Sequence, residues 1–216
     1  MGWKIFTTFI KDSGQVEINE KLIESLGFRD FEKVGESEFN FGPKDGELYV
    51  SNYKGNLLIA HNNLNFEFAK EHQSKTEANF ISKFPDSIII SISLGYILFY
   101  CVIEKGVKVR LRESGDEVYQ DYGELLPEEL YLKTQELIPA EDLEEMKEDL
   151  SEEEIEMEIQ NTISYETVFE LTKRIFEKRF DELELNEYKL SGFKFINKKI
   201  ESESDYGKKA EMQFIQ

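Results

Sequence analysis

The sequence predicts an α+β fold: a largely antiparallel sheet built from hairpins, with packed helices and a C-terminal helical segment. Three observations lead to this prediction. Residues 87–103 form an uncharged run rich in β-branched side chains, turn-prone residues separate pairs of strand-like segments, and strands and helices do not alternate regularly. We expect one domain over residues 1–200, followed by a polar, flexible tail at residues 201–216.

The first elements are predicted from their apolar character and their capping residues. Residues 3–10 are largely apolar and predict a central strand. Asn19 is a favoured helix N-cap, and residues 20–26 place Leu and Ile side chains on one helical face before Gly27. We therefore expect a short helix that Gly27 ends.

A hairpin and a second helix follow. Residues 47–52 and 56–61 are strand-like, and residues 53–55 (Tyr-Lys-Gly) suit a tight turn between them. Residues 75–83 predict a helix that ends before Pro85.

The uncharged run at residues 87–103 has three candidate interpretations: a membrane span, a catalytic centre and the core of a soluble fold. Its 17 residues are near the lower limit for a membrane-spanning helix. However, its isoleucines favour strands, Ser91 and Ser93 alternate with apolar residues, and no cluster of Lys or Arg flanks it. We interpret it as two strands, or one kinked strand at Gly95, in the interior of a sheet.

The next strand carries positive charge. Residues 104–106 predict a turn, and residues 107–112 alternate between apolar and basic side chains. Strict alternation places the basic side chains on one face, where they meet solvent or the protein's own carboxylates: Lys108, Arg110 and Arg112. A short strand at residues 118–121 and an exit at Gly123 complete this hairpin.

The second half of the chain is helical and strongly acidic. Residues 126–138 predict a helix with Pro127 in its first turn. The acidic helical segment at residues 140–160 has 11 acidic residues and one basic residue, Lys147, so it carries −10 of the net charge of −19. Two interpretations remain open: a solvated helix or mobile arm, and a surface that docks a basic protein.

The last predicted elements are a helix and a strand. Ser164 is an expected N-cap for an amphipathic helix at residues 165–180, whose apolar face includes Val168, Leu171 and Ile175. Residues 188–199 then predict a final strand.

The global charge limits the classes of partner. A net charge of −19 disfavours binding to phosphate backbones and to acidic membrane surfaces, so we expect neither nucleic acid nor membrane as a partner. The single cysteine, Cys101, lies among apolar residues and fits a small buried side chain in a reducing compartment. The N-terminal residues lack the pattern of a signal peptide, and together these features predict a cytoplasmic protein.

A search for catalytic and metal-binding motifs gives no strong candidate. The sequence contains no P-loop, no Gly-x-Gly-x-x-Gly, no Gly-x-Ser-x-Gly and no His-Glu-x-x-His. His61 and His72 do not have zinc-ligand spacing, and Asp86 with Glu104 and Lys105 is a weak match to a metal nuclease. We expect no cofactor and no metal. His61 follows a strand, where it suits a pocket rim or, more simply, a turn.

Three stretches resemble a bacterial family of uncharacterised proteins, a domain of unknown function. They are the N-terminal MGWK, the segment GPKDGELYVSNYKGNLLI, and the segment from ISLGYILFY to GELLPEE, together covering about residues 2–130. The resemblance implies an α+β fold and assigns no activity and no functional residues.

These observations predict a non-catalytic, cytosolic protein-binding module that docks a basic protein through its acidic surface, in the manner of an inhibitor or immunity protein. The alternatives are an enzyme with an unrecognised carboxylate-based site and an acidic subunit of a larger assembly. The sequence leaves the partner and the oligomeric state open. The residues expected to contact the partner are Glu144, Glu145, Asp149, Glu152, Glu153 and Glu154.

Overall fold

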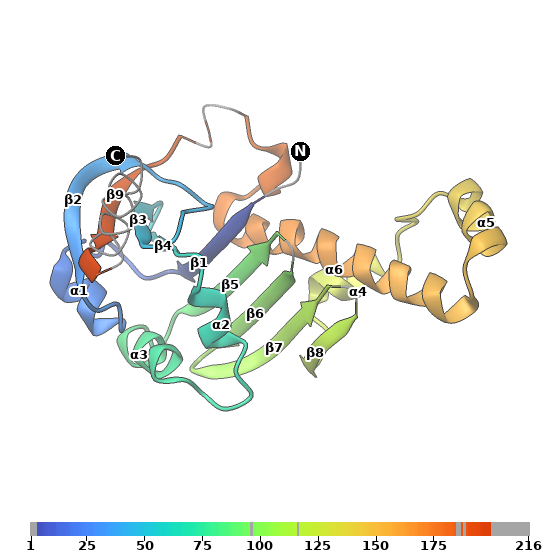
Figure 1. Cartoon of the computed structure of the whole chain (residues 1–216), viewed down its shortest axis with the longest axis horizontal. Helices are drawn as coiled ribbons and strands as arrows, with labels where there is room; N and C mark the ends of the chain where they lie inside the picture. The colour runs from blue at the N-terminus through green and yellow to red at the C-terminus, as the bar shows by residue number, and fades with distance from the viewer. Residues whose placement is uncertain (1–3, 96, 116, 185–186, 188, 200–216) are drawn as a thin grey trace, which may run out of the picture.

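The described residues are built around a nine-stranded antiparallel sheet, which confirms the α+β class (Figure 1). The computed structural model describes residues 4–95, 97–115, 117–184, 187 and 189–199. The strand order across the sheet is β2-β9-β3-β4-β1-β5-β6-β7-β8. The strands are β1 (Ile5–Lys11), β2 (Phe31–Glu38), β3 (Glu47–Tyr53), β4 (Asn56–Ala60), β5 (Ile88–Leu94), β6 (Leu98–Glu104), β7 (Val107–Ser114), β8 (Val118–Gly123) and β9 (Ser191–Asn197).

Helices cover both faces of the sheet. The helices are α1 (Glu20–Ser25), α2 (Leu64–Phe68), α3 (Lys75–Lys83), α4 (Pro127–Leu132), α5 (Ala140–Asp149), α6 (Glu152–Phe176) and the 3₁₀ helix η1 (Phe180–Glu182). One core packs α1, α2 and α3 against the sheet, for example through Ile23 and Phe80. The other core packs α6 and η1 against the opposite face, for example through Val168 and Phe180.

This two-sided covering explains why residues 87–103 lack a clear polar alternation. Ile89 and Ile103 belong to the core under α1–α3, whereas Ile90 and Val102 belong to the core under α6. Because successive strand residues point to opposite faces, a strand that is buried on both faces needs apolar residues at nearly every position. The prediction of two buried strands is confirmed. Among the described residues, no helix has both the length and the apolar character needed to cross a membrane.

Local signals in the first half of the chain predicted the observed elements well. β1 lies between β4 and β5 in the middle of the sheet. The Asn19 side chain accepts a hydrogen bond of 3.0 Å from the Leu22 amide at the start of α1, and Gly27 follows that helix with a φ of 103°. The β3–β4 hairpin is confirmed, whereas β2 and α2 were not predicted, since β2 is polar and α2 is short.

The strict alternation predicted for residues 107–112 is wrong because β7 contains a β-bulge. Val102 pairs with Arg110 while the next residue, Ile103, pairs with Lys108, so Val109 is the extra residue. The bulge sends Lys108 to the α3 face, where its ammonium contacts Glu77 at 3.1 Å. Arg110 remains on the α6 face with Val109, which packs against the core there.

Two helix boundaries also differ from the prediction. α4 ends at Leu132 instead of continuing to residue 138, because Thr134 bonds back to the Tyr131 carbonyl through both its amide and its hydroxyl. α6 begins after Ser151, so Ser164 lies inside the helix and is not its N-cap. Glutamate is a strong helix former and the acidic side chains reach solvent, so the charge run continues the helix. The tail predicted at residues 201–216 lies outside the described residues.

Candidate functional site

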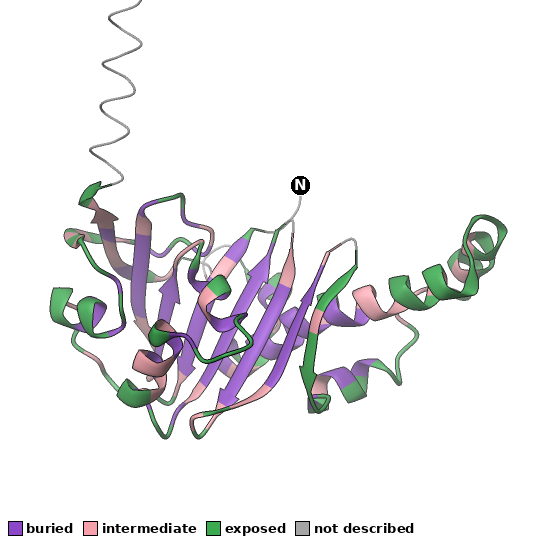
Figure 2. Ribbon diagram, turned by 60° about the horizontal axis from the view of Figure 1, so that its bottom comes forward, coloured by how far each residue is buried: buried purple, intermediate pink, exposed green. Residues whose placement is uncertain are grey.

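The acidic segment forms an arm that extends past the β8 edge of the sheet. We define the acidic arm as residues 140–160, which are α5 and the first part of α6. Figure 1 shows α5 at the far end of the molecule, joined to the sheet by α6. Figure 2 shows that the arm is exposed, whereas the part of α6 that lies against the sheet is buried. α5 has no buried residue, and the buried residues of α6 begin at Ile163.

The structure places all six predicted contact residues on the exposed arm. Glu145, Asp149, Glu152 and Glu153 make no hydrogen bond or ion pair through their side chains with any other described residue. Glu144 pairs with Lys147 at 2.6 Å, and both side chains are more than half exposed.

Glu154 differs from the other five because it stabilises the start of α6. Its carboxylate accepts a hydrogen bond of 2.8 Å from the Ser151 amide, while the Ser151 hydroxyl accepts one of 3.3 Å from the Glu154 amide. This reciprocal pair is a capping box, and the hydrogen bond from the Ser151 amide lowers the pKa of the Glu154 carboxyl. Part of the hydrogen-bonding capacity of the Glu154 carboxylate is therefore used at the start of α6.

The arm has a small apolar seam with the body of the protein. Leu143 of α5 and Ile159 and Ile163 of α6 line a cleft of about 170 Å³ together with Leu132 at the end of α4. Leu143 thus faces inward instead of contributing to a continuous outer stripe with Leu150, which is 38% exposed. The outer surface of the arm consists mainly of carboxylates, and Leu150 and Met157 are exposed apolar side chains on it.

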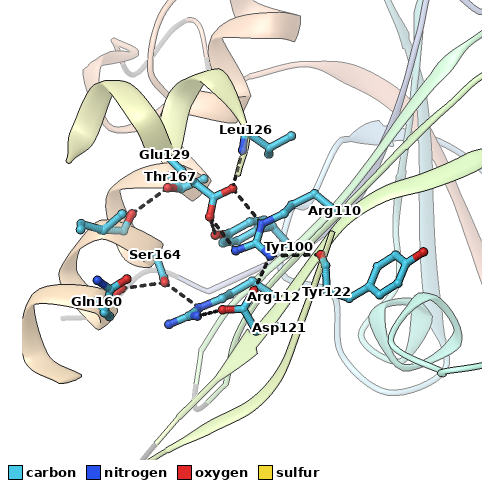
Figure 3. Close-up of polar contacts among 11 residues, drawn as sticks. Tyr100, Arg110, Arg112, Asp121, Tyr122, Leu126, Glu129, Gln160, Ser164 and Thr167 are labelled. Atoms are coloured by element: carbon cyan, nitrogen blue, oxygen red, sulfur yellow. Dashed lines mark hydrogen bonds and ion pairs between the residues drawn. The ribbon is translucent and has the colours of Figure 1, made fainter. Parts of the chain in front are cut away.

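A buried ion pair holds α4 against the sheet near the root of the arm (Figure 3). Arg110 on β7 is 1% exposed, and its Nε and Nη2 atoms donate to the two oxygens of Glu129 on α4 at 2.8 Å and 2.7 Å. The Glu129 carboxylate also accepts hydrogen bonds from the Tyr100 hydroxyl at 2.9 Å and from the Leu126 amide at 2.8 Å. Four donors on one carboxylate satisfy a charge that would otherwise be costly to bury.

A second arginine fixes α6 where it leaves the sheet. Arg112 donates from Nε to the Ser164 hydroxyl at 3.1 Å and from Nη1 to Asp121 on β8, which also binds Arg110. The Ser164 hydroxyl in turn donates to the Gln160 carbonyl at 2.7 Å. Ser164 therefore joins the helix to the sheet, a role that its position in the sequence does not reveal.

The electrostatics of this cluster are those of a structural anchor. Partial burial would raise the pKa of the Asp121 carboxyl, but the hydrogen bonds and charges of Arg110 and Arg112 lower it below its ordinary value. Burial, followed by the charge of Glu129, raises the pKa of the Tyr100 hydroxyl. Four of the five N–H donors of Arg110 bond to described residues and its side chain is 1% exposed, so Arg110 is not accessible to a substrate. Of the two alternatives predicted for this basic face, the protein's own carboxylates are the observed partners.

The remaining candidates for chemistry lie apart from the arm. His61 packs against the rings of Phe28 and Phe31, and burial lowers its pKa to about 4, so the ring is neutral near pH 7. Cys101 is buried, and burial raises the pKa of its thiol to about 12. Within the described part of the chain, no group of three or more His, Cys, Asp or Glu side chains is arranged to hold a metal ion.

Comparison of the chain with protein families, with curated proteins and with solved structures finds no match. The resemblance to a bacterial domain of unknown function stays a prediction, and the function has to be inferred from the geometry itself.

Proposed function

We propose that this protein is a non-catalytic, cytosolic protein-binding module whose acidic arm docks a basic protein, as an inhibitor or immunity protein would. The supporting observation is the charge of the arm: eleven acidic residues and one basic residue on two exposed helices. Long-range attraction from such a surface accelerates encounter with a basic partner and disfavours acidic ones.

The anchor at the root of the arm supports the same proposal. Arg112 and Ser164 hold α6 to the sheet close to where its exposed half begins. A charged surface on a fixed helix needs less ordering on binding than the same charges on a free chain, and less ordering favours affinity. The proposal therefore rests on negative charge carried by a helix that the sheet holds in place.

The test is a pair of variants with equal change in net charge. The arm variant carries Lys at Glu145, Asp149, Glu152 and Glu153, which spares the Glu154 cap. The control variant carries Lys at four exposed acidic residues outside the arm: Glu17, Glu24, Glu36 and Glu38. Partners captured from an extract of the native host at about 50 mM salt are compared for wild type and both variants, and again at about 200 mM salt.

The proposal predicts that the arm variant loses a basic partner that the control variant keeps, and that higher salt weakens capture by wild type. If every captured partner stays bound to the arm variant, or if both variants lose it equally, docking through the arm is wrong.

One observation favours the alternative of an acidic subunit in a larger assembly. β8 is an edge strand whose residues are exposed except for the half-buried Gln120, with Tyr119 47% and Tyr122 59% exposed. Exposed edges with aromatic side chains are suited to pairing with another chain. Light scattering over a range of protein concentrations measures the molar mass: a mass above 25.4 kDa that Tyr122→Lys reduces favours the assembly, and a constant monomer mass disfavours self-assembly.

A further inference from the structure

A second, unrelated site lies at one end of the sheet, far in the sequence from the acidic arm. A cleft of about 580 Å³ opens between the start of β1, residues 43–45, the turn before α2, α2 itself, Ser93 on β5 and Ile97 before β6. This volume is within the range of small-molecule sites in proteins. Its polar side chains include Lys4, Lys44, Asp45, Asn62 and Asn65, and its apolar walls include Phe6 and Phe66.

The backbone around the cleft is held in place by close contacts. The Phe6 amide donates to the Phe41 carbonyl at 2.8 Å, and the His61 amide donates to the Phe6 carbonyl at 3.1 Å. A Cβ atom on Gly42 would lie 2.5 Å from the Lys4 carbonyl oxygen, so only glycine permits this approach. The cleft is therefore preformed, and binding does not require its walls to assemble.

Two amide oxygens in its wall lack partners. The Oδ1 atoms of Asn62 and Asn65 are buried and accept no hydrogen bond from any described residue, and Asn65 as a whole is 4% exposed. Asn62 uses its Nδ2 to donate to Asp45. Buried unsatisfied acceptors are uncommon in proteins and destabilise them. Because the terminal torsion of asparagine is soft, a small rotation lets each oxygen accept from an N–H group in the cleft.

The two lysines of the cleft have no close ion-pair partner among the described residues, and the charge of Lys44 acts on Glu47 from a distance. Neither Lys4 nor Lys44 forms an ion pair with any described carboxylate, although the chain has 45 Asp and Glu residues. The Lys4 ammonium instead lies 5.9 Å from the centre of the Phe6 ring. In a protein with a net charge of −19, two unpaired ammonium groups at one cleft form a local site for a small anion.

Aromatic rings supply the apolar surface. Phe66 on α2 lines the cleft and is 49% exposed, so part of its side chain is accessible to a ligand. Phe6 on β1 also lines the cleft. Such rings stack favourably on a planar heteroaromatic ligand.

We propose that this cleft binds a nucleoside monophosphate. The base would donate N–H groups to the Asn62 and Asn65 oxygens and stack on the phenylalanine rings, the phosphate would pair with the lysines, and the ribose hydroxyls would donate to Asp45. Each group that lacks a partner in the cleft then acquires one of matching chemistry. This inference does not depend on the acidic arm or on the function proposed for it.

The experiment titrates the full chain with AMP, GMP, CMP and UMP and follows binding by calorimetry and by the rise in melting temperature. The expected result is saturable binding of at least one of them, with the corresponding nucleoside and ribose 5-phosphate each binding at least about tenfold more weakly. Absence of binding by all four, or equally tight binding of ribose 5-phosphate, overturns the proposal.

Substitutions separate the recognition of the base from that of the phosphate. Lys44→Ala should weaken binding of the monophosphate about tenfold and leave the nucleoside unchanged, whereas Phe66→Ala should weaken both. Lys83→Ala, at an exposed lysine on α3, is the matched control and should change neither. If Lys44→Ala and Lys83→Ala change the affinity for the monophosphate equally, Lys44 is not part of the anion site.

Asn65→Leu distinguishes a binding role from a structural one. The two side chains have the same number of heavy atoms and the same branching, and the leucine removes an acceptor that has no partner among the described residues, so the free protein should keep or gain stability. Binding of the monophosphate and of the nucleoside should nevertheless weaken. Loss of stability with unchanged affinity would show that Asn65 serves the fold and not the ligand.

Discussion

The Glu129 carboxylate should be the most sensitive single group in the fold. In Glu129→Gln the side chain keeps its shape but loses its charge, so the Arg110 guanidinium stays buried next to a neutral amide. Arg110 is 1% exposed and Glu129 is 3% exposed, so solvent cannot replace the lost interaction. Removing one member of a buried ion pair typically costs about 3–5 kcal/mol, and we expect a loss of this size in the free energy of unfolding.

The neighbouring residue on the same helix provides a matched control. Glu128 also pairs with an arginine, Arg174, at 2.6 Å, but the two side chains are 16% and 17% exposed. Solvent therefore compensates part of the loss, and Glu128→Gln should cost only about 1 kcal/mol. Urea unfolding followed by circular dichroism measures both values, provided that the slope of the transition is unchanged.

A double variant tests whether the cost comes from the buried charge of Arg110, whose remaining ion pair is with Asp121, a residue that is 43% exposed and also pairs with Arg112. Arg110→Met combined with Glu129→Met removes both charges, and it should be less destabilised than Glu129→Gln alone. The reasoning is refuted if Glu129→Gln and Glu128→Gln lose similar stability, or if the double variant is the least stable of all.

The remaining predictions concern a titrating group, a turn and a helix start. Burial lowers the pKa of His61 from 6.5 to about 4, so as the pH falls the histidine is protonated in the unfolded chain before it is protonated in the folded protein. The contribution of neutral, buried His61 to folding stability is therefore present above about pH 6.5 and is lost towards pH 4. Between pH 7 and pH 5 the wild type should lose about 2 kcal/mol more than His61→Gln in urea unfolding, and parallel pH profiles would contradict this. Gly123→Ala should cost more than about 3 kcal/mol, because φ is 89° and the new Cβ would lie 2.0 Å from the Val109 carbonyl oxygen. Gly14 has a φ of 71° and no atom near the position of a new Cβ, so Gly14→Ala should lower the free energy of unfolding by only about 1 kcal/mol. Equal losses of stability in the two glycine variants would show that the clash with the Val109 carbonyl does not matter. Ser151→Ala should increase hydrogen exchange in the first turn of α6 by an amount equivalent to about 1 kcal/mol, and unchanged exchange there would contradict the capping role.

Some features of the fold could be predicted because their causes are local. The hairpin turns at Lys54-Gly55 and Lys105-Gly106 have positive φ at both residues, as the Lys-Gly pairs between strand-like segments indicated. The exposure of the acidic arm follows equally from its composition, because that many carboxylates cannot be buried without partners.

Other features could not be predicted because they depend on residues far apart in the chain. β9 lies between β2 and β3, so a strand from the end of the described chain completes a sheet begun more than 150 residues earlier. The same holds for the cleft, where Lys4, Asn65 and Ile97 meet only after β1, α2 and β5 have packed together. No local pattern marks these contacts.

The sequence by itself determined the class of fold, the buried strands of the middle segment and the concentration of negative charge, because periodicity, turn chemistry and charge act over a few residues. Only the tertiary structure decided what Arg110, Arg112 and Ser164 do. A β-bulge in β7 selected which basic side chains face α6, and long-range packing brought Glu129 and Asp121 to them. The free energy of those contacts comes from burying charges beside distant partners, and one strand or helix alone contains neither the partners nor the burial.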